Sequence, residues 1–285
     1  VFASENDLLS LDNERLRDII AMLQATEKSL SSDAAIYIPA ERIIANIIKD
    51  SIANLVLHNV PIPKHILAFA AELEKLKTKA IDLHFIQQGL KYKSDAKGEY
   101  LYIDDTNFIS LEAAASGIQS IIPILSFADK MKSSDHRSFV IEEPELNLFP
   151  SAQYKLIEFI ESIRKDPTKF DWEDLGIIHT YTTHSPYILS ALNNFLYAHK
   201  IISDSYAQLE FDDPKRDQIE KSMTDKVKMI VKATVDPESF TAYQIKDGYA
   251  TPIFDEKTGL ISNNFIDEST DEINETFEKL MELSL

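Results

Sequence analysis

Residues 138–145, Ser-Phe-Val-Ile-Glu-Glu-Pro-Glu, constrain the fold of this chain more than any other segment. The apolar run from Phe139 to Ile141 is typical of a short buried strand, and two carboxylates, Glu142 and Glu143, follow it directly. Pro144 has no N–H group to donate, so the hydrogen-bonded strand has to end there. Carboxylates at such a position lie at the edge of a parallel sheet where α/β proteins bind ligands. A strand that reaches solvent can also end in two glutamates without any function. The segments before and after it therefore determine whether a functional site is indicated.

The segments that follow predict a parallel sheet. Residues 151–164 have the apolar spacing of an amphipathic helix, and residues 175–182 show a second buried-strand pattern. Pro186 suits the first position of the next helix, with Ser185 as its cap. Strand, helix, strand and helix therefore alternate, and parallel strands in such an arrangement end at the same edge of the sheet.

Both predicted strands end in polar side chains. Glu142 and Glu143 follow the first strand, and Thr183 and His184 follow the second. A single histidine at a strand end is more often structural, but a histidine beside two carboxylates is a candidate site. In a nucleotide hydrolase, the first acid at this position orients Mg²⁺ and the second can polarise the attacking water.

The other segments predict helices, one short strand and two hairpins. Residues 35–38 form a buried-strand pattern, and two amphipathic helices at residues 41–59 and 64–79 follow it as an inserted lobe. Alternating patterns interrupted by turn residues predict a hairpin at residues 90–103, with a loop of about five residues at 94–98, and another at residues 240–254. Further helices are predicted at residues 13–30, 214–231 and 267–285. The expected fold is α/β, with a mostly parallel sheet flanked by helices, a helical insertion and β-hairpins.

Composition excludes several classes of protein. The chain of 285 residues has no cysteine, so it can form neither disulfides nor thiolate metal sites. Its net charge of −18 argues against a broad nucleic-acid-binding surface, because Lys and Arg drive binding to phosphates. No apolar run approaches the roughly 18 residues that span a bilayer, and no signal-peptide pattern is present. These features predict a cytoplasmic protein that does not enter membranes.

Ser116 and Gly117 mark another candidate site. The apolar spacing that begins at Ile118 predicts a helix with Ser116 as its N-cap. Free backbone N–H groups at a helix start can bind a phosphate, and a glycine there allows an anion to approach closely. An ordinary capped helix explains the same residues equally well.

Three segments in a fixed order carry a resemblance to a known family. They are Ala-Ser-Gly-Ile-Gln at residues 115–119, Phe-Val-Ile-Glu-Glu-Pro-Glu-Leu-Asn-Leu at residues 139–148, and Thr-Thr-His-Ser-Pro at residues 182–186. Together they resemble the signature motif, the Walker B strand with its D-loop, and the switch-histidine motif of ABC-type ATPases. The branch they resemble comprises the SMC-like and overcoming-lysogenization-defect proteins, a large group of bacterial AAA-type ATPases. Ile-Pro-Ala-Glu-Arg at residues 38–42 is similar to a strand-end motif of the same branch.

The resemblance implies an ABC-ATPase-like P-loop NTPase fold that uses ATP and Mg²⁺. By this resemblance, Glu142 would hold the water shell of Mg²⁺, Glu143 would act as the base or water-orienting residue, and His184 would contact the γ-phosphate. Phe149 departs from the family pattern, which usually has Asp or His there.

The resemblance also implies a head-to-tail homodimer with two composite sites. Ser116 and Gly117, with Gln119 in the same signature motif, would contact the γ-phosphate of ATP bound to the opposite subunit. Asn147 in the D-loop would face that subunit. ATP hydrolysis at this interface would drive a conformational switch, which relatives use in DNA repair, chromosome organisation and phage defence. A separate effector protein is a further expected partner.

The chain contains no Gly-x-x-x-x-Gly-Lys-Ser/Thr segment, so a phosphate cradle and its lysine are missing from these residues. We therefore expect the chain to be the C-terminal part of such an ATPase and not to hydrolyse ATP by itself. The expected parts are the end of an N-terminal ATPase lobe at 1–42, a helical insertion at 43–80, the C-terminal ATPase part at 81–260 and an acidic helix at 261–285.

Two other functions remain open from the residues alone. The chain could be a degenerate ATPase fold that binds no nucleotide and only scaffolds a partner protein. It could also be a metal hydrolase that uses Glu142, Glu143 and His184. His179 and His184 lack the spacing and the glutamate of a zinc-binding helix, so this second alternative ranks last.

Overall fold

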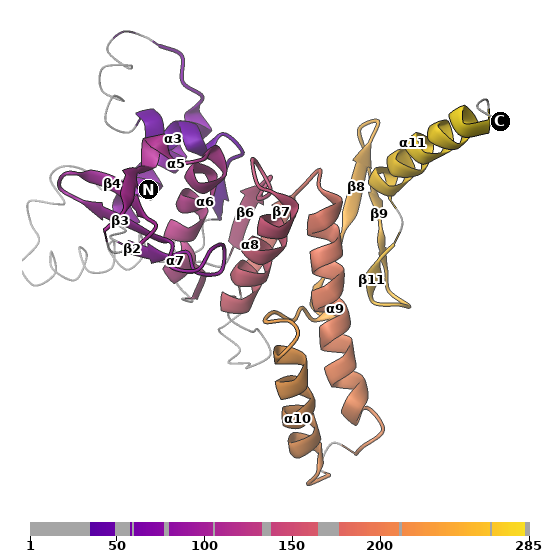
Figure 1. Cartoon of the computed structure of the whole chain (residues 1–285). Coiled ribbons are helices and arrows are strands. Elements are labelled where there is room, and N and C mark those ends of the chain that lie inside the picture. Colours follow the sequence, from indigo (N-terminus) through magenta and orange to yellow (C-terminus); the bar gives the residue numbers. More distant parts are fainter. Residues whose placement is uncertain are drawn as a thin grey trace, which may run out of the picture.

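The computed structural model describes residues 35–48, 58, 60–76, 80–104, 106–132, 138–164, 177–210, 213–262 and 264–282 (Figure 1). A parallel three-stranded sheet comprises β1 (Ile36–Ile38), β6 (Ser138–Glu142) and β7 (Ile178–Thr182), in the order β1-β6-β7. Glu142 lies opposite Thr182 in the register, so β6 and β7 end together. We call this edge of the sheet the carboxyl edge. The parallel sheet and its flanking helices confirm the predicted α/β class.

Two helices hold the loops at the carboxyl edge. Helix α8 (Pro150–Ile163) follows β6, and helix α9 (Pro186–Tyr206) follows β7. Both begin with proline, which suits a first turn because the N–H group there needs no partner within the helix. Ser185 caps α9, since its hydroxyl accepts a hydrogen bond from the backbone N–H of Tyr187 at 3.1 Å. Helices α8 and α9 pack against each other, with the ring of Tyr154 beside that of Phe195, and both helices contribute side chains without solvent exposure, which include Leu156, Ile157, Ile160 and Ile188.

A lobe of short helices and an antiparallel sheet precedes β6. Helices α3 (Arg42–Ile48), α5 (Lys64–Leu76) and α6 (Ser116–Ser126) pack together, and α7 (Ala128–Lys132) follows. The antiparallel sheet has the order β2-β3-β4-β5, with strands Ala80–Asp82, Lys91–Asp95, Gly98–Tyr102 and Phe108–Ser110. The short 3₁₀ helix η1 (Leu111–Ala113) leads from this sheet into α6. Figure 1 shows these elements on the far side of β6 from α9.

The C-terminal part of the chain lies along α9 and beyond it. Helix α10 (Arg216–Lys228) packs against α9, and the 3₁₀ helix η2 (Pro237–Ser239) leads to the hairpin of β8 (Tyr243–Lys246) and β9 (Tyr249–Pro252). A second short pair, β10 (Phe254–Asp255) and β11 (Leu260–Ile261), precedes α11 (Phe265–Glu282), which extends away from the other elements in Figure 1. No helix in the described part of the chain has the length and apolar character needed to cross a bilayer.

Several element boundaries differ from those predicted. The first hairpin turns through two residues, Ala96 and Lys97, rather than five, because Asp95 Oδ1 accepts from the backbone N–H of Lys97 at 2.7 Å. Ser116 is the first residue of α6 and Ala115 is its N-cap, so the predicted capping by Ser116 is wrong. Pro123 lies inside α6, which continues to Ser126. The helix predicted at residues 13–30 lies outside the described residues.

Candidate functional site

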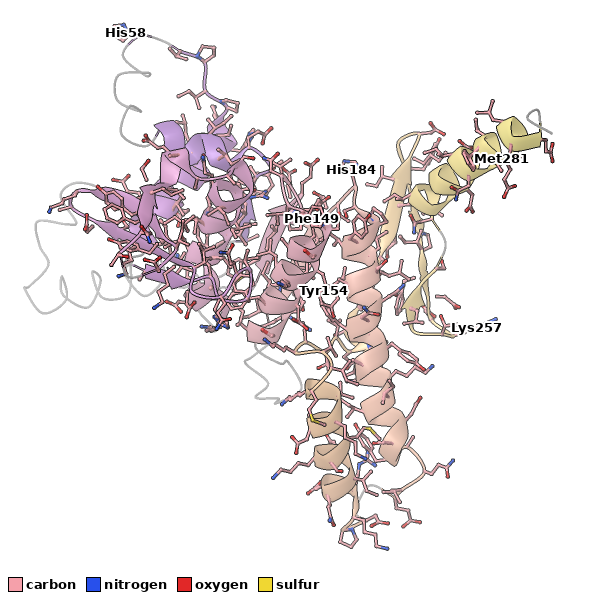
Figure 2. The ribbon with its side chains drawn as sticks, in the orientation of Figure 1. His58, Phe149, Tyr154, His184, Lys257 and Met281 are labelled. Carbon is pink, nitrogen blue, oxygen red and sulfur yellow. The ribbon has the colours of Figure 1, made fainter. Side chains whose placement is uncertain are left out.

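The carboxyl edge brings Glu143 and His184 together. Glu143 follows β6 directly, and its N–H donates to the carbonyl oxygen of Thr182 at 2.9 Å, which ties it to the end of β7. His184 Nε2 lies 3.6 Å from Glu143 Oε1, with side chains 80% and 32% exposed, respectively. Figure 2 shows His184 next to the start of α9. Both groups are therefore accessible to a ligand from solvent.

The backbone of Glu143 is held in a sparsely populated conformation. Its φ angle is 40°, in the left-handed region that residues other than glycine rarely adopt. Such conformations persist where surrounding structure imposes them, and they are frequent at functional sites. Within the described residues, the carboxylate of Glu143 has one hydrogen-bond or ion-pair partner, His184.

Glu142 is fixed more tightly than Glu143. Its Oε2 accepts from the backbone N–H of Ala40 at 3.2 Å, and it also accepts a hydrogen bond from the hydroxyl of Tyr37. Burial, together with the hydrogen bond and charge of Glu142, raises the pKa of Tyr37 to about 12. Glu142 thus joins the end of β6 to the end of β1, and its half-buried carboxylate still borders the same edge as Glu143.

Arg42 is a site residue whose structural role the sequence did not reveal. Its side chain is completely buried, and it donates to the carbonyl oxygens of Ser120 at 2.9 Å, Glu142 at 2.8 Å and Glu143 at 2.8 Å. A further bond of 3.2 Å reaches the carbonyl oxygen of Pro39. One guanidinium group therefore connects β1, α6 and the loop after β6.

Burial lowers the pKa of Arg42 to about 10, and the nearby carboxylates of Glu145, Glu143 and Glu142 oppose this shift. The pKa stays well above neutrality, so the guanidinium carries its charge at physiological pH. A buried cation beneath three glutamates reduces their mutual repulsion, which helps them occupy one edge of the sheet.

The start of α6 packs against the loop between β6 and α8, residues 143–149, which we call the acidic loop. Gly117 is buried there, and a Cβ atom added to it would lie 2.6 Å from the carbonyl oxygen of Asn147 and 3.1 Å from Leu148 Cδ2. Asn147 itself is exposed and has a φ angle of 62°, a conformation that asparagine tolerates better than most residues. The predicted signature residues and the predicted D-loop therefore touch within one chain.

The other two signature residues differ in accessibility. Ser116 is exposed at the first position of α6. Gln119 is half-buried, and its Nε2 donates to the carbonyl oxygens of Ala114 at 2.8 Å and Glu112 at 3.1 Å. Gln119 thus holds the segment before α6 in place, and Ser116 is the more accessible of these two side chains.

Residues 4–189 match the family described as AAA ATPase domain. The chain belongs to this family. The match covers the acidic loop, the start of α6 and His184, so all the predicted site residues of this AAA ATPase domain lie within it. Neither a curated protein nor a solved structure matches the chain.

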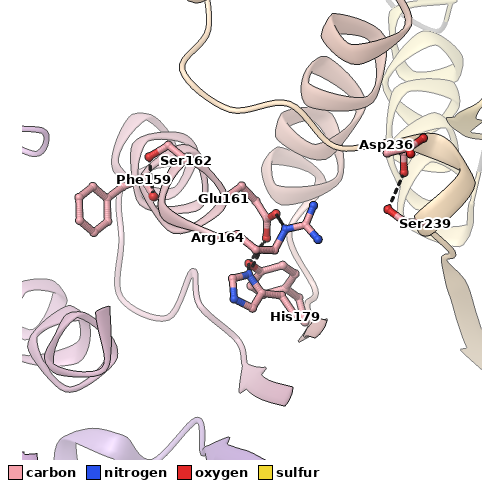
Figure 3. Close-up of polar contacts among 8 residues, drawn as sticks. Phe159, Glu161, Ser162, Arg164, His179, Asp236 and Ser239 are labelled. Carbon is pink, nitrogen blue, oxygen red and sulfur yellow. Dashed lines mark hydrogen bonds and ion pairs between the residues drawn. The ribbon is translucent and has the colours of Figure 1, made fainter. Parts of the chain in front are cut away.

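A second polar cluster of this AAA ATPase domain lies deeper along β7 (Figure 3). Glu161 on α8 is buried and bonds Arg164 Nε at 2.9 Å, His179 Nδ1 at 3.0 Å and the hydroxyl of Tyr181. Burial raises the pKa of Glu161, but the bonds and charges of His179, Arg164 and Tyr181 outweigh it and lower the pKa below its ordinary value. Burial and the charge of Glu161 raise the pKa of Tyr181 well above its usual value. This cluster holds α8 against β7.

The contacts of His179 in this cluster also bear on the metal-hydrolase alternative. His179 pairs in register with Phe139, further back along the sheet than Glu142, and its side chain is only 2% exposed. His179 is therefore engaged with Glu161 and does not face the carboxyl edge. In the described residues, no group of three or more His, Cys, Asp or Glu side chains could hold a metal ion by itself.

Proposed function

We propose that this AAA ATPase domain supplies the hydrolytic part of an ATPase site at its carboxyl edge. The contact of 3.6 Å between Glu143 and His184 carries the proposal, because it joins an acid and an imidazole on an accessible edge of a parallel sheet. Glu143 orients and polarises the attacking water, and His184 contacts the γ-phosphate. Membership of an ATPase family supports this assignment.

The donor groups at the edge suit Mg²⁺ in the presence of a nucleotide. Mg²⁺ prefers one or two carboxylates, completed by phosphate oxygens and waters, over a cage made only of protein ligands. Glu142 would hold the hydrated ion, since Ala40 and Tyr37 fix its carboxylate beside Glu143. When bound, Mg²⁺ would neutralise negative charge that develops on the phosphate oxygens.

The exposed residues at the start of α6 and in the acidic loop extend the proposal to a homodimer. Ser116 and Asn147 are both exposed, so a second copy in head-to-tail orientation could present its nucleotide to them. Gly117 packs against the backbone of Asn147, and Gln119 bonds the segment before α6, so both hold this surface in place. Closure and opening of that dimer would form the switch, and a separate effector protein would respond to it.

The proposed physiological setting is DNA repair or phage defence, which rests on the resemblance of the motifs alone. The alternative, a scaffold that binds no nucleotide, is favoured by one observation: the sequence contains no Gly-x-x-x-x-Gly-Lys-Ser/Thr segment. Only the first function requires chemistry at the carboxyl edge.

Steady-state ATP hydrolysis by the product of the whole gene separates these functions. Glu143→Gln should lower turnover by about 10²-fold or more and leave ATP binding intact, because it removes the water-orienting carboxylate alone. Glu74→Gln is the matched control, since Glu74 is exposed on α5. Wild-type turnover in Glu143→Gln would contradict the catalytic assignment. A wild-type gene product that binds no ATP would support the scaffold.

A further inference from the structure

The acidic loop contains a third glutamate, Glu145, that the predicted mechanism does not use. Its Oε1 accepts from the hydroxyl of Thr183 at 2.7 Å and from the backbone N–H of His184 at 2.8 Å. Both donors belong to residues 183–185, which we call the histidine loop. Glu145 therefore reaches from the loop after β6 to the loop after β7.

We propose that Glu145 is a positioning residue that sets the distance between Glu143 and His184. The inference rests on the proposed ATPase function and deepens it. Glu145 lies two residues after Glu143 and binds the backbone of His184 directly, so one side chain fixes both partners of the 3.6 Å contact. The imidazole of His184 is 80% exposed and lacks a packed environment that could fix it otherwise.

The position of the carboxylate supports this role over a catalytic one. In the part of the chain that the structure describes, Glu145 Oε2 is buried without a hydrogen-bond partner, so neither oxygen is free to act on a ligand in solvent. Burying a polar atom without a partner costs free energy, which the two bonds at Oε1 and the charge of Arg42 offset. The result is a histidine loop held in place by Glu145.

The hydrogen bond from Thr183 to Glu145 is part of a network that shapes the histidine loop. Thr183 Oγ1 donates to Glu145 and also accepts from the backbone N–H of Ser185 at 3.0 Å. Ser185 Oγ in turn donates to Gln153 Oε1 at 2.6 Å, and Gln153 Nε2 donates to the carbonyl oxygen of Leu148 at 2.9 Å. Besides the contact between Glu143 and His184, the acidic and histidine loops are thus linked through Glu145 and through Gln153.

Amide substitution separates positioning from catalysis. The carbonyl oxygen of a glutamine can accept the same two hydrogen bonds, whereas a catalytic carboxylate loses its function as an amide. In the whole gene product, we therefore expect Glu145→Gln to keep kcat within about threefold of the wild type. Glu145→Ala should lower kcat by about 10- to 100-fold, with KM for ATP nearly unchanged, because the nucleotide-binding contacts are not removed.

The measurement is steady-state ATP hydrolysis with purified Glu145→Gln, Glu145→Ala and Glu143→Gln side by side. If Glu143→Gln is inactive while Glu145→Ala has wild-type kcat, the positioning inference fails and the proposed function stands. If Glu143→Gln has wild-type turnover, the proposed function itself fails. A Glu145→Gln variant as inactive as Glu143→Gln would make Glu145 catalytic and overturn the positioning role.

A second variant covers the case in which Glu145→Ala does not fold. Thr183→Val removes one of the two donors to Glu145 and keeps the backbone N–H of His184. We expect a kcat about 3- to 10-fold below the wild type, with KM for ATP unchanged. Wild-type kcat in this folded variant would overturn the inference.

Discussion

A Cβ atom on Gly117 would lie 2.6 Å from the carbonyl oxygen of Asn147, closer than real Cβ atoms approach a backbone oxygen. The start of α6 and the acidic loop therefore fit together only with glycine at position 117. Arg42 adds a second link, since it bonds the carbonyl oxygens of Ser120 in α6 and of Glu143 in the acidic loop. A displacement of α6 would thus be transmitted to the residue that we assign to catalysis.

Gly117→Ala should destabilise the domain, because either α6 or the acidic loop has to move to admit the methyl group. We expect a loss of about 1–3 kcal/mol in the free energy of unfolding, typical of overpacked positions. Urea denaturation followed by circular dichroism measures this loss. Ser116→Ala is the matched control, since Ser116 is the preceding, exposed residue and should change stability by less than about 0.5 kcal/mol. Equal stability of the two variants would show that the contact is not tight.

Arg42→Met should destabilise the domain more strongly. It leaves the carbonyl oxygens of Ser120, Glu142 and Glu143 without their donor in a buried environment. It also removes the positive charge beneath the acidic loop. We expect a loss of about 3–5 kcal/mol, because several buried acceptors lose this donor at once.

Arg42→Lys tests how much of the lost stability is due to the lost charge. Lysine keeps the charge but has three donors on a single atom instead of a planar fork, so it cannot reach all of these carbonyl groups at once. Its urea midpoint should lie between those of Arg42→Met and the wild type. A midpoint of Arg42→Met equal to that of the wild type would contradict the structural role of Arg42.

Glu161 should contribute to stability in a pH-dependent manner. Its pKa is lower in the folded domain than the ordinary value of 4.5, so its contribution is complete above that value and is lost as the pH falls through the folded pKa. Urea midpoints of wild type and Glu161→Gln should therefore differ most near neutrality and converge as the pH falls below 4.5. Glu74→Gln, at an exposed position of α5, is the surface control and should keep the urea midpoint close to that of the wild type. A difference that stays constant across this range would contradict the lowered pKa.

The isolated chain of 285 residues should bind Mg-ATP with negligible affinity. It has no Gly-x-x-x-x-Gly-Lys-Ser/Thr segment, and its net charge of −18 opposes the approach of an anionic ligand. Isothermal titration calorimetry at micromolar nucleotide should give no saturable heat. A tight one-to-one isotherm would contradict the assignment of Ser116 to a nucleotide bound by another subunit.

The parallel sheet and the polar ends of its strands were predictable because they follow from local patterns. The apolar run before Glu142 and the start of α9 at Ser185 and Pro186 each depend on residues close in sequence. The first hairpin was less predictable, because the side chain of Asp95 and the positive φ angle of Gly98 allow the strands to extend to a two-residue turn.

The links within the site could not be predicted in the same way. Arg42 is the first residue of α3, and its side chain bonds carbonyl groups 78 to 101 residues away in the sequence, which no periodic pattern could reveal. Glu161 likewise meets His179 and Tyr181 only because α8 packs on β7. The alternation of His179 and Tyr181 on one face of a strand was the available signal, since it places two polar groups together.

A structure of the whole gene product with Mg²⁺ and a non-hydrolysable ATP analogue tests the central claim most directly. We predict the γ-phosphate in contact with the imidazole of His184, the attacking water beside the carboxylate of Glu143, and the ion on the side of Glu142. Ser116 of a second copy should approach the same phosphate. A nucleotide bound elsewhere, with Glu143 and His184 remote from its γ-phosphate, would contradict the assignment of the carboxyl edge as the site of ATP hydrolysis.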